Sequence, residues 1–372
     1  MAQLFTELSL SAQTAYAQLL DATLGAEHVR SVADLTGSFN AKTVKGRIYW
    51  YFQYTEPSGK LRQVYVGPDS EPVHRLMQRK AEPGASAALQ PLARSAIALG
   101  CAAILPRHYR VVRRLADYGF FKAGGVLIGT HAFLAYGNML GVRWEAQERT
   151  QDIDLAHAGN ALALIMPGNV EVKTDDAISS LDMGFLPVSG LSGSAGATYL
   201  IPKEPEFRLD FLTPLHRGDD EPFVHPQLGV PLQPLPFMEF SLEGLEQAAL
   251  LCPEGAVLVD IPDPARFALH KLIVQGERKG AFRGKSNKDL AQSAHLLAYL
   301  GEYRGDQVQE ALADLLVRGP AWTARFKQGV TALMKAHPDL ATQPVGAMLS
   351  SAAANKGAQR KSVPKPGARR VR

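Results

Sequence analysis

Two aspartates separated by one residue, Asp152 and Asp154, give the most specific chemical signal in the sequence. They lie in the segment DIDLAH, where Ile153 and Leu155 alternate with them. Residues two apart in a β-strand point the same way, so both carboxylates would share one face while the apolar residues turn to the core. Adjacent carboxylates ionise together readily only beside a cation, and Mg²⁺ prefers carboxylate oxygen, phosphate and water. The alternative is a strand edge that reaches solvent without any metal.

A third carboxylate, Asp210, lies in the segment EFRLDFLTP. Alternation there puts Arg208 and Asp210 on one face and Leu209 and Phe211 on the other, which is typical of a half-buried strand. Three carboxylates on neighbouring strands could hold two Mg²⁺ (or Mn²⁺) ions about 3.5–4 Å apart, the arrangement used for phosphoryl chemistry. The alternative is that Asp210 merely caps, or pairs with Arg208, at the surface.

An anion site is indicated upstream, in AGGVLIGTHAFLAYG. An apolar strand runs into Gly129 and Thr130 and then into a helix, so backbone amides and the Thr130 hydroxyl would meet at a helix N-terminus, where anions bind readily. Gly129 would let a phosphate approach the backbone closely. A tight turn followed by a helix cap accounts for the same two residues equally well.

The elements that would position these groups alternate between short strands and helices from Gly124 to about Thr213. We expect a helix over residues 132–139 and a flexible loop or hairpin connection over residues 189–196. The expected strands cover residues 126–129, 152–156, 161–166, 198–202 and 207–212. This α/β portion would carry the chemistry.

The N-terminal part predicts a helix over residues 3–35, then a basic aromatic β-hairpin over residues 36–68 with its turn at Pro57–Gly59, then mainly helix over residues 71–121. Cations and aromatic rings alternate in the hairpin, which suits stacking on bases and pairing with phosphates. The candidate nucleic-acid contacts are Lys45, Arg47, Tyr49 and Tyr51. Alternatively, the aromatic face packs on neighbouring helices, because an isolated hairpin is marginally stable.

The charge distribution separates the C-terminus from the rest of the chain. The net charge is +4, but residues 350–372 contain seven cations and no acid, which leaves −3 for residues 1–349. Such a segment cannot bury enough apolar surface to fold, so we expect a disordered basic tail. It is either a weak nucleic-acid tether or a solubilising end.

Several classes of protein are excluded. No run of 18 apolar residues and no secretory signal pattern occurs, so we expect a cytoplasmic protein with no membrane partner. Cys101 and Cys252 are far apart and lack CxxC or Cys/His partners, which argues against zinc clusters and disulfides. The motifs of zinc proteases, serine hydrolases and dinucleotide-binding enzymes are absent.

Together, GGVLIGTHAF, RTQDIDL and RLDFLTP resemble the DNA polymerase beta-like nucleotidyltransferase superfamily over roughly residues 106–215, and look closest to a bacterial nucleotidyltransferase family related to toxin-type members of toxin–antitoxin pairs. In that superfamily a Gly-containing strand end opens a helix, an Asp-apolar-Asp strand follows, and a later strand supplies a third carboxylate. Two features depart from this pattern. Thr130 replaces the usual Ser or Gly, and 22 residues separate Gly129 from Asp152, which requires an inserted loop around residues 142–148.

The resemblance implies a role for each matching residue. Gly129 and Thr130 would contact the triphosphate of an NTP, Asp152 and Asp154 would bind both metal ions, and Asp210 would bind the ion that activates the acceptor. Further contacts would come from Arg149 to phosphate or acceptor, from Lys271 to the triphosphate, and from the pair Lys288 and Asp289. Lys271 could instead reach solvent, and Asp289 could be a surface partner of Lys285 or Lys288.

We therefore predict an α+β fold: a small mixed nucleotidyltransferase sheet flanked by helices, with an N-terminal helix and β-hairpin region and a C-terminal helical domain. The expected boundaries are 1–105, 106–236 for the catalytic core, 237–345 for the helical domain and 346–372 for the tail. The predicted reaction moves an NMP from an NTP, ATP for example, to a hydroxyl of RNA (tRNA) or protein, and an antitoxin-type protein would be a candidate partner. The alternative is a non-catalytic protein that binds nucleic acid or a partner with the same fold.

Overall fold

The computed structural model describes residues 4–28, 37–55, 61–81, 85–145, 150–157, 172–189, 195–215, 220–275 and 283–354. By its internal contacts the chain divides between Pro264 and Ala265 into two compact units. The expected strand at residues 161–166 lies outside the described residues. The larger unit contains the aspartates, and the smaller one is helical.

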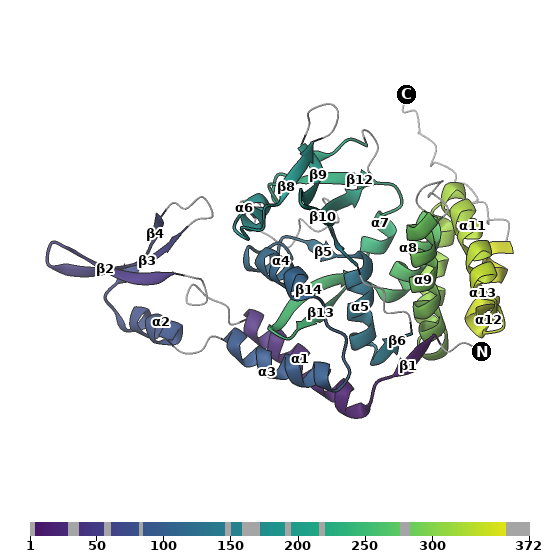
Figure 1. The fold of residues 1–372 in the computed structure, drawn as a ribbon, viewed down its shortest axis with the longest axis horizontal. Helices are drawn as coiled ribbons and strands as arrows, with labels where there is room; N and C mark the ends of the chain where they lie inside the picture. The colour runs from purple at the N-terminus through teal and green to yellow at the C-terminus, as the bar shows by residue number, and fades with distance from the viewer. Residues whose placement is uncertain are drawn as a thin grey trace, which may run out of the picture. The chain divides into compact units, whose positions relative to one another are not determined.

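A mixed sheet is the centre of the larger unit, and in the described part of the chain it has seven strands. The strands beside the acidic residues are β7 (Asp152–His157) and β10 (Glu204–Pro214) in the interior of the sheet and β5 (Gly125–Leu127) at one end of the strand order. Strand β10 runs parallel to β7, whereas β5 is antiparallel to β7. The outer strands, several of which are labelled beside β10 in Figure 1, are β8 (Leu186–Ser189), β9 (Ala195–Ile201), β11 (Phe223–Val224) and β12 (Pro231–Leu235).

Alternation along β7 and β10 is the physical reason that the central strands form where they do. Ile153, Leu155, Leu209 and Phe211 are fully buried, while the residues between them are half-buried. One face of the strand pair therefore packs into the core and the other carries the acidic groups. The predicted α+β fold with a small mixed sheet is confirmed.

Helix α5 (Gly129–Met139) follows β5, and hydrogen bonds and ring stacking fix its position. The Tyr136 hydroxyl donates a hydrogen bond to the carbonyl of Pro262 at 2.7 Å, and the Trp144 indole donates one to the carbonyl of Phe133 at 2.9 Å. The rings of Phe133 and Trp144 stack with their centroids 5.0 Å apart. These contacts set the position of the helix N-terminus beside the sheet.

Two sequence predictions near this helix are wrong. The segment expected as an inserted loop around residues 142–148 begins with strand β6 (Val142–Trp144), which pairs with β1 (Phe5–Glu7). The helix expected over residues 3–35 therefore starts later, as α1 (Leu10–His28). Both strands have only three residues, and they form by pairing between segments that are distant in the sequence. Local periodicity therefore does not predict them.

The region expected to be helical from residue 237 begins differently. A short helix, α7 (Glu239–Leu242), leads into an antiparallel hairpin of β13 (Leu245–Cys252) and β14 (Gly255–Pro262). The hairpin contacts α1, α3 (Ala85–Ala98) and α4 (Pro106–Asp117). Small buried residues such as Ala12, Ala93, Ala249 and Ala256 allow this close packing.

The aromatic segment near the N-terminus is a sheet of three strands and not a two-stranded hairpin. Its strands are β2 (Ser38–Val44), β3 (Arg47–Thr55) and β4 (Leu61–Pro68), and α2 (Glu71–Ala81) follows them, all in purple and blue in Figure 1. The missed turn is Lys45–Gly46, whose φ angles are 49° and 75°. Two consecutive positive φ values are typical of the tight turns that join hairpin strands.

The smaller unit is a set of helices, shown in green and yellow in Figure 1. Helices α8 (Pro264–Gln275) and α11 (Pro320–Ala336) approach so closely that a Cβ added at Gly329 would lie 2.1 Å from the Leu272 carbonyl oxygen. The tail predicted from residue 346 is wrong for residues 346–354, which are helical, and residues 355–372 lie outside the described residues. The helices are α8 (Pro264–Gln275), α9 (Arg283–Tyr303), α10 (Gly305–Val317), α11 (Pro320–Ala336), α12 (Pro338–Ala341) and α13 (Pro344–Ala354).

In the described part of the chain, no helix has the length and apolar character needed to cross a membrane.

Candidate active site

The register of β7 and β10 brings the predicted acidic residues together. Asp210 is the Cα partner of Asp154, and Arg208 is the partner of Asp152. Partners on adjacent strands lie about 4.8 Å apart, and their side chains point to the same side. Asp152, Asp154 and Asp210 therefore share one face of the sheet, opposite the buried face.

Two of the carboxylates have neighbours on the same face. The Thr198 hydroxyl, from the adjacent strand β9, donates a hydrogen bond of 2.6 Å to Oδ1 of Asp210. Oδ1 of Asp152 lies 3.7 Å from Nε of Arg208, with side chains 23% and 44% exposed. Asp210 thus lies beside a threonine, and the ion pair that involves Arg208 is with Asp152. Sequence reasoning missed Thr198, although its strand was predicted.

Asp154 lies against the N-terminus of α5. A Cβ added at Gly129 would lie 2.0 Å from Oδ2 and 2.9 Å from Cγ of Asp154. Gly129 has a φ of 65°, and the backbone N–H of Ile128 donates to the Asp154 carbonyl at 3.0 Å. The Asp154 carboxylate thus lies against Gly129 on the side where a Cβ would project. The positive end of the helix dipole favours an anion there. Thr130, the next residue, is buried.

Arg107, at the start of α4, forms hydrogen bonds to residues at the beginning of both acidic strands. Its guanidinium bonds to Glu204 at 3.0 Å, at the beginning of β10, and to Gln151, immediately before β7. It also lies over the ring of Phe207, 4.8 Å from the centroid. Pro106 sets the helix start, because its fixed φ suits the first helical position. Sequence reasoning did not single out Arg107, whose partners are distant in the chain.

A buried histidine pair lies behind this network. Nδ1 of His108 and Nε2 of His131 are 2.9 Å apart, and the His108 ring stacks on Phe207 with centroids 5.1 Å apart. Burial, together with the positive charge of Arg107, lowers the pKa of His108 from 6.5 to about 4. The fold therefore holds this imidazole neutral at pH values where a solvated histidine is charged.

This pKa predicts a pH-dependent stability. Between about pH 6.5 and pH 4 the unfolded chain binds a proton at His108 that the folded chain does not, so stability is full above pH 6.5 and falls as the pH drops toward 4. We expect His108→Asn to reduce the number of protons taken up on unfolding at pH 5 by about one. Urea unfolding of both proteins from pH 7 to pH 4.5 measures this number. Parallel pH profiles for the two proteins would contradict the assignment.

The remaining predicted residues lie elsewhere. Arg149 lies outside the described residues. In the smaller unit, Nζ of Lys271 on α8 bonds to Oδ1 of Asp289 on α9 at 2.8 Å, with side chains 13% and 4% exposed. Asp289 is therefore buried and is not the surface partner of Lys285 or Lys288 that was considered. Lys288 is half-buried. The roles of Lys271, Lys288 and Asp289 toward a nucleotide stay predictions.

The donors on the acidic face fit a hard cation in part. Asp154 and Asp210 are facing carboxylates, the donor type that Mg²⁺ prefers. Nevertheless, among the described residues no three His, Cys, Asp or Glu side chains are gathered as a ligand set for one ion. Asp152 lies toward Arg208, so it could join Asp154 and Asp210 as a ligand only after a change of its side-chain position. The face is thus a two-carboxylate platform with a third carboxylate beside it.

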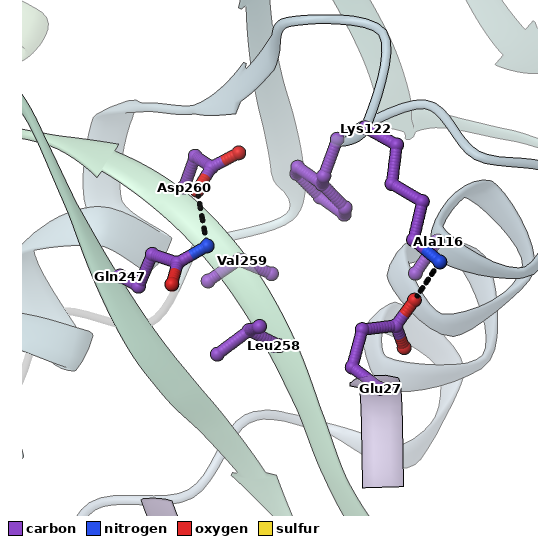
Figure 2. A pocket seen from close by; sticks show the side chains of 8 residues that line it. Glu27, Ala116, Lys122, Gln247, Leu258, Val259 and Asp260 are labelled. Atoms are coloured by element: carbon purple, nitrogen blue, oxygen red, sulfur yellow. Dashed lines mark hydrogen bonds and ion pairs between the residues drawn. The ribbon is translucent and has the colours of Figure 1, made fainter. Parts of the chain in front are cut away.

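A separate pocket of about 450 Å³ lies beside β14 in the larger unit (Figure 2). Glu27 and Lys122 form an ion pair of 2.7 Å at one side, and Gln247 donates a hydrogen bond of 3.2 Å to Asp260 at the other. Burial raises the pKa of Asp260. The floor is apolar and includes Leu258 and Val259. None of the residues predicted for catalysis lines this pocket, so it is distinct from the acidic face.

Comparison with known proteins gives one extended match. Residues 107–317 match the model of a family described as Nucleotidyltransferase. This span contains Gly129, the three aspartates and the Lys271–Asp289 pair. Among solved structures, an antigenic nucleotidyltransferase-like protein from Paracoccidioides brasiliensis is similar, with 17% identity, a TM-score of 0.28, and coverage of 60% of this chain and 94% of that one. No curated protein matches the chain.

Proposed function

Since the chain belongs to the nucleotidyltransferase family, and is by that membership a transferase, we propose that it moves a nucleoside monophosphate from an NTP to an acceptor hydroxyl at the face of Asp152, Asp154 and Asp210. The register that sets Asp210 opposite Asp154, beside the N-terminus of α5, carries this proposal. It gathers negative oxygen donors and a positive helix end at one place, as the transfer of a phosphoryl group requires.

Each residue has a proposed role. The backbone at Gly129 and Thr130 binds the triphosphate, and Asp154 and Asp210 hold divalent metal, Mg²⁺ or Mn²⁺, with Asp152 as the further ligand for a pair of ions. When bound, such ions polarise phosphate oxygens and lower the pKa of the acceptor hydroxyl. Thr198 orients Asp210 through its 2.6 Å hydrogen bond. Arg208 balances the charge of Asp152.

The reaction needs no covalent intermediate with the protein. The acceptor oxygen attacks the α-phosphorus, the bond to the β-phosphate oxygen breaks, and pyrophosphate leaves while the hydroxyl proton passes to solvent. The chain contributes mainly position and fixed charge, which together account for most of the acceleration in phosphoryl transfer. The rigid packing of Ile153, Leu155, Leu209 and Phe211 beneath the face supports this preorganisation.

We propose an RNA end, of a tRNA for example, as the acceptor, because the basic aromatic segment and the cationic C-terminus suit a polyanion. The test incubates the purified chain with each α-labelled NTP, Mg²⁺ and total RNA or lysate, beside an Asp152→Asn, Asp154→Asn double variant. Label in the RNA fraction supports the proposal, and label in protein would make the chain a protein nucleotidylating enzyme. No label, or equal label with the variant, would favour a non-catalytic binding protein. A restraining antitoxin-type partner stays a prediction.

Thr198→Val is expected to lower kcat about 10- to 100-fold, because a hydrogen bond to a charged group typically stabilises by about 1.5–3 kcal/mol. The Mg²⁺ concentration needed for half-maximal activity should rise, and Thr198→Ser should restore both values. Thr213→Val is the matched control, since its hydroxyl bonds to the backbone carbonyl of His157 and not to a carboxylate. Equal losses in Thr198→Val and Thr213→Val would show that Thr198 has only a structural role.

A further inference from the structure

One face of the sheet of β2, β3 and β4 is partly covered, although Val64, the partner of Phe52 on this face, is 50% exposed. Phe52 is 1% exposed, its ring centroid is 5.1 Å from that of Phe39, and the indole of Trp50 donates a hydrogen bond of 2.8 Å to Asp69, just before α2. Val73 of α2 is buried and lies against Gly67 of β4, where a Cβ would meet it at 3.2 Å. This face meets the need of a small sheet for an apolar partner.

The opposite face carries three tyrosines that lie across β3 and β4. Tyr51 is the Cα partner of Tyr65, and their ring centroids are 5.5 Å apart. Tyr49 and Tyr65 have centroids 6.3 Å apart, and Tyr65 is 53% exposed. We call these three rings the tyrosine platform; Tyr49 and Tyr51 are half-buried, and in the described part of this segment α2 packs on the other side. A partly exposed aromatic cluster of this kind is typical of an interaction surface.

Cations surround the tyrosine platform. Nζ of Lys42, on β2, lies 4.5 Å from the centroid of the Tyr51 ring, and Lys45 and Arg47 are exposed at the adjacent turn. Residues 37–55 and 61–68 contain no aspartate or glutamate, although residues 1–349 as a whole are net negative. The charge of this sheet is therefore complementary to a polyanion and opposite to that of the remainder of residues 1–349.

Side-chain amides lie beside the rings. Asn40 and Gln63 each donate a side-chain hydrogen bond to Oε1 of Gln53, at 3.0 and 2.9 Å. The amides of all three residues come from the tyrosine face, because Asn40 pairs with Tyr51 and Gln63 pairs with Gln53. Neutral amides offer both donors and acceptors to the edges of bases, and they add no charge that would repel phosphate.

We propose that this face binds single-stranded RNA, with bases stacked on Tyr49, Tyr51 and Tyr65 and phosphates paired with Lys42, Lys45 and Arg47. Stacking on these partly exposed rings requires unpaired bases, which excludes a duplex, and the cations require a polyanion, which disfavours an ordinary protein surface. The inference rests on the proposed transfer only in that the bound strand would be the acceptor. Binding itself needs no catalysis.

Anisotropy with a 5′-labelled, unstructured 12-nucleotide RNA tests the proposal on the full chain. Tyr51→Leu, Tyr65→Leu should raise Kd about 10- to 100-fold, because each base stacked on an aromatic ring contributes an effect of that order. Tyr54→Leu is the matched control, since Tyr54 lies on β3 but on the covered face, stacked near Phe52. Lys42→Gln, Arg47→Gln should lower the slope of log Kd against log salt by about 1 to 2, whereas Arg75→Gln on α2 should not.

A second measurement separates this face from the basic C-terminus. Photocrosslinking of a 4-thiouridine RNA, followed by peptide mapping, should yield adducts within residues 38–68. Crosslinks confined to other segments, an unchanged Kd in the tyrosine variant, or tighter binding of duplex RNA or DNA would overturn the proposal. The transfer assay is independent: Asp154→Asn should bind RNA normally and transfer no label. RNA bound at this face by a wild-type chain that transfers nothing would refute the proposed function and leave this inference intact.

Discussion

Asp154→Asn and Asp210→Asn are each expected to lower the rate of nucleotide transfer by a factor on the order of a thousand or more, equivalent to several kcal/mol of barrier. The two carboxylates are partners across adjacent parallel strands. Each substitution therefore removes one of the two negative charges that this pair offers to a divalent ion. Asparagine keeps the shape and one oxygen but not the charge. The loss should therefore appear in kcat and in Mg²⁺ affinity together.

Single-turnover rates at saturating NTP, measured over a range of Mg²⁺ concentrations, check this expectation. Asp182→Asn is a suitable control, because Asp182 has a φ of 52°, which asparagine adopts easily, and it is not on the acidic face. Thermal unfolding of each variant separates loss of chemistry from loss of fold. Transfer at the wild-type rate by either Asp154→Asn or Asp210→Asn would refute the assignment of the active site.

Gly129→Ala is expected to abolish most activity, by about 100-fold or more, and to destabilise the fold by roughly 2–4 kcal/mol. The new methyl group would lie 2.0 Å from Oδ2 of Asp154, so the carboxylate would have to leave the helix N-terminus. The positive φ of 65° adds backbone strain of about 1–2 kcal/mol for any residue with a Cβ.

Gly184→Ala isolates the contribution of the contact. Gly184 has a φ of 76° and nothing within 4 Å of an added Cβ, so alanine there meets the same backbone strain without a collision. We expect Gly184→Ala to lose about 1 kcal/mol of stability and to keep full activity. Chemical denaturation and initial rates on both variants give the comparison. If both variants were equally active, the close approach of Asp154 to Gly129 would have no role in catalysis.

Local patterns determined the acidic strands and the helix beside them. The alternation in DIDLAH and in EFRLDFLTP predicted β7 and β10, together with the side of the sheet that carries Asp152, Asp154 and Asp210. This was possible because a half-buried strand alternates apolar and polar residues at neighbouring positions. The Gly129–Thr130 junction likewise predicted that a helix follows the strand, although α5 begins at Gly129 and not at residue 132. The mixed sheet and the family resemblance followed from the order of these same segments.

Segments that fold by distant pairing escaped the same reasoning. LEQAALLC, in β13, is rich in residues that favour helices, and it becomes a strand because all eight of its residues pair with β14. Strands β1 and β6 are too short to show any periodicity. The Lys45–Gly46 turn was a local signal that could have been found, since glycine after a polar residue often marks a hairpin turn.

The sequence by itself thus determined which side of a strand the acidic residues occupy and that a helix follows the first strand, since each of these depends on neighbours within a few positions. Only the tertiary structure decided that Asp210 lies opposite Asp154, that Thr198 bonds to Asp210, and that Asp154 fills the space left by Gly129. It also decided that Lys271 pairs with a buried Asp289. Contacts of this kind depend on strand register and helix packing, which arise from the whole core and are not encoded in any one segment.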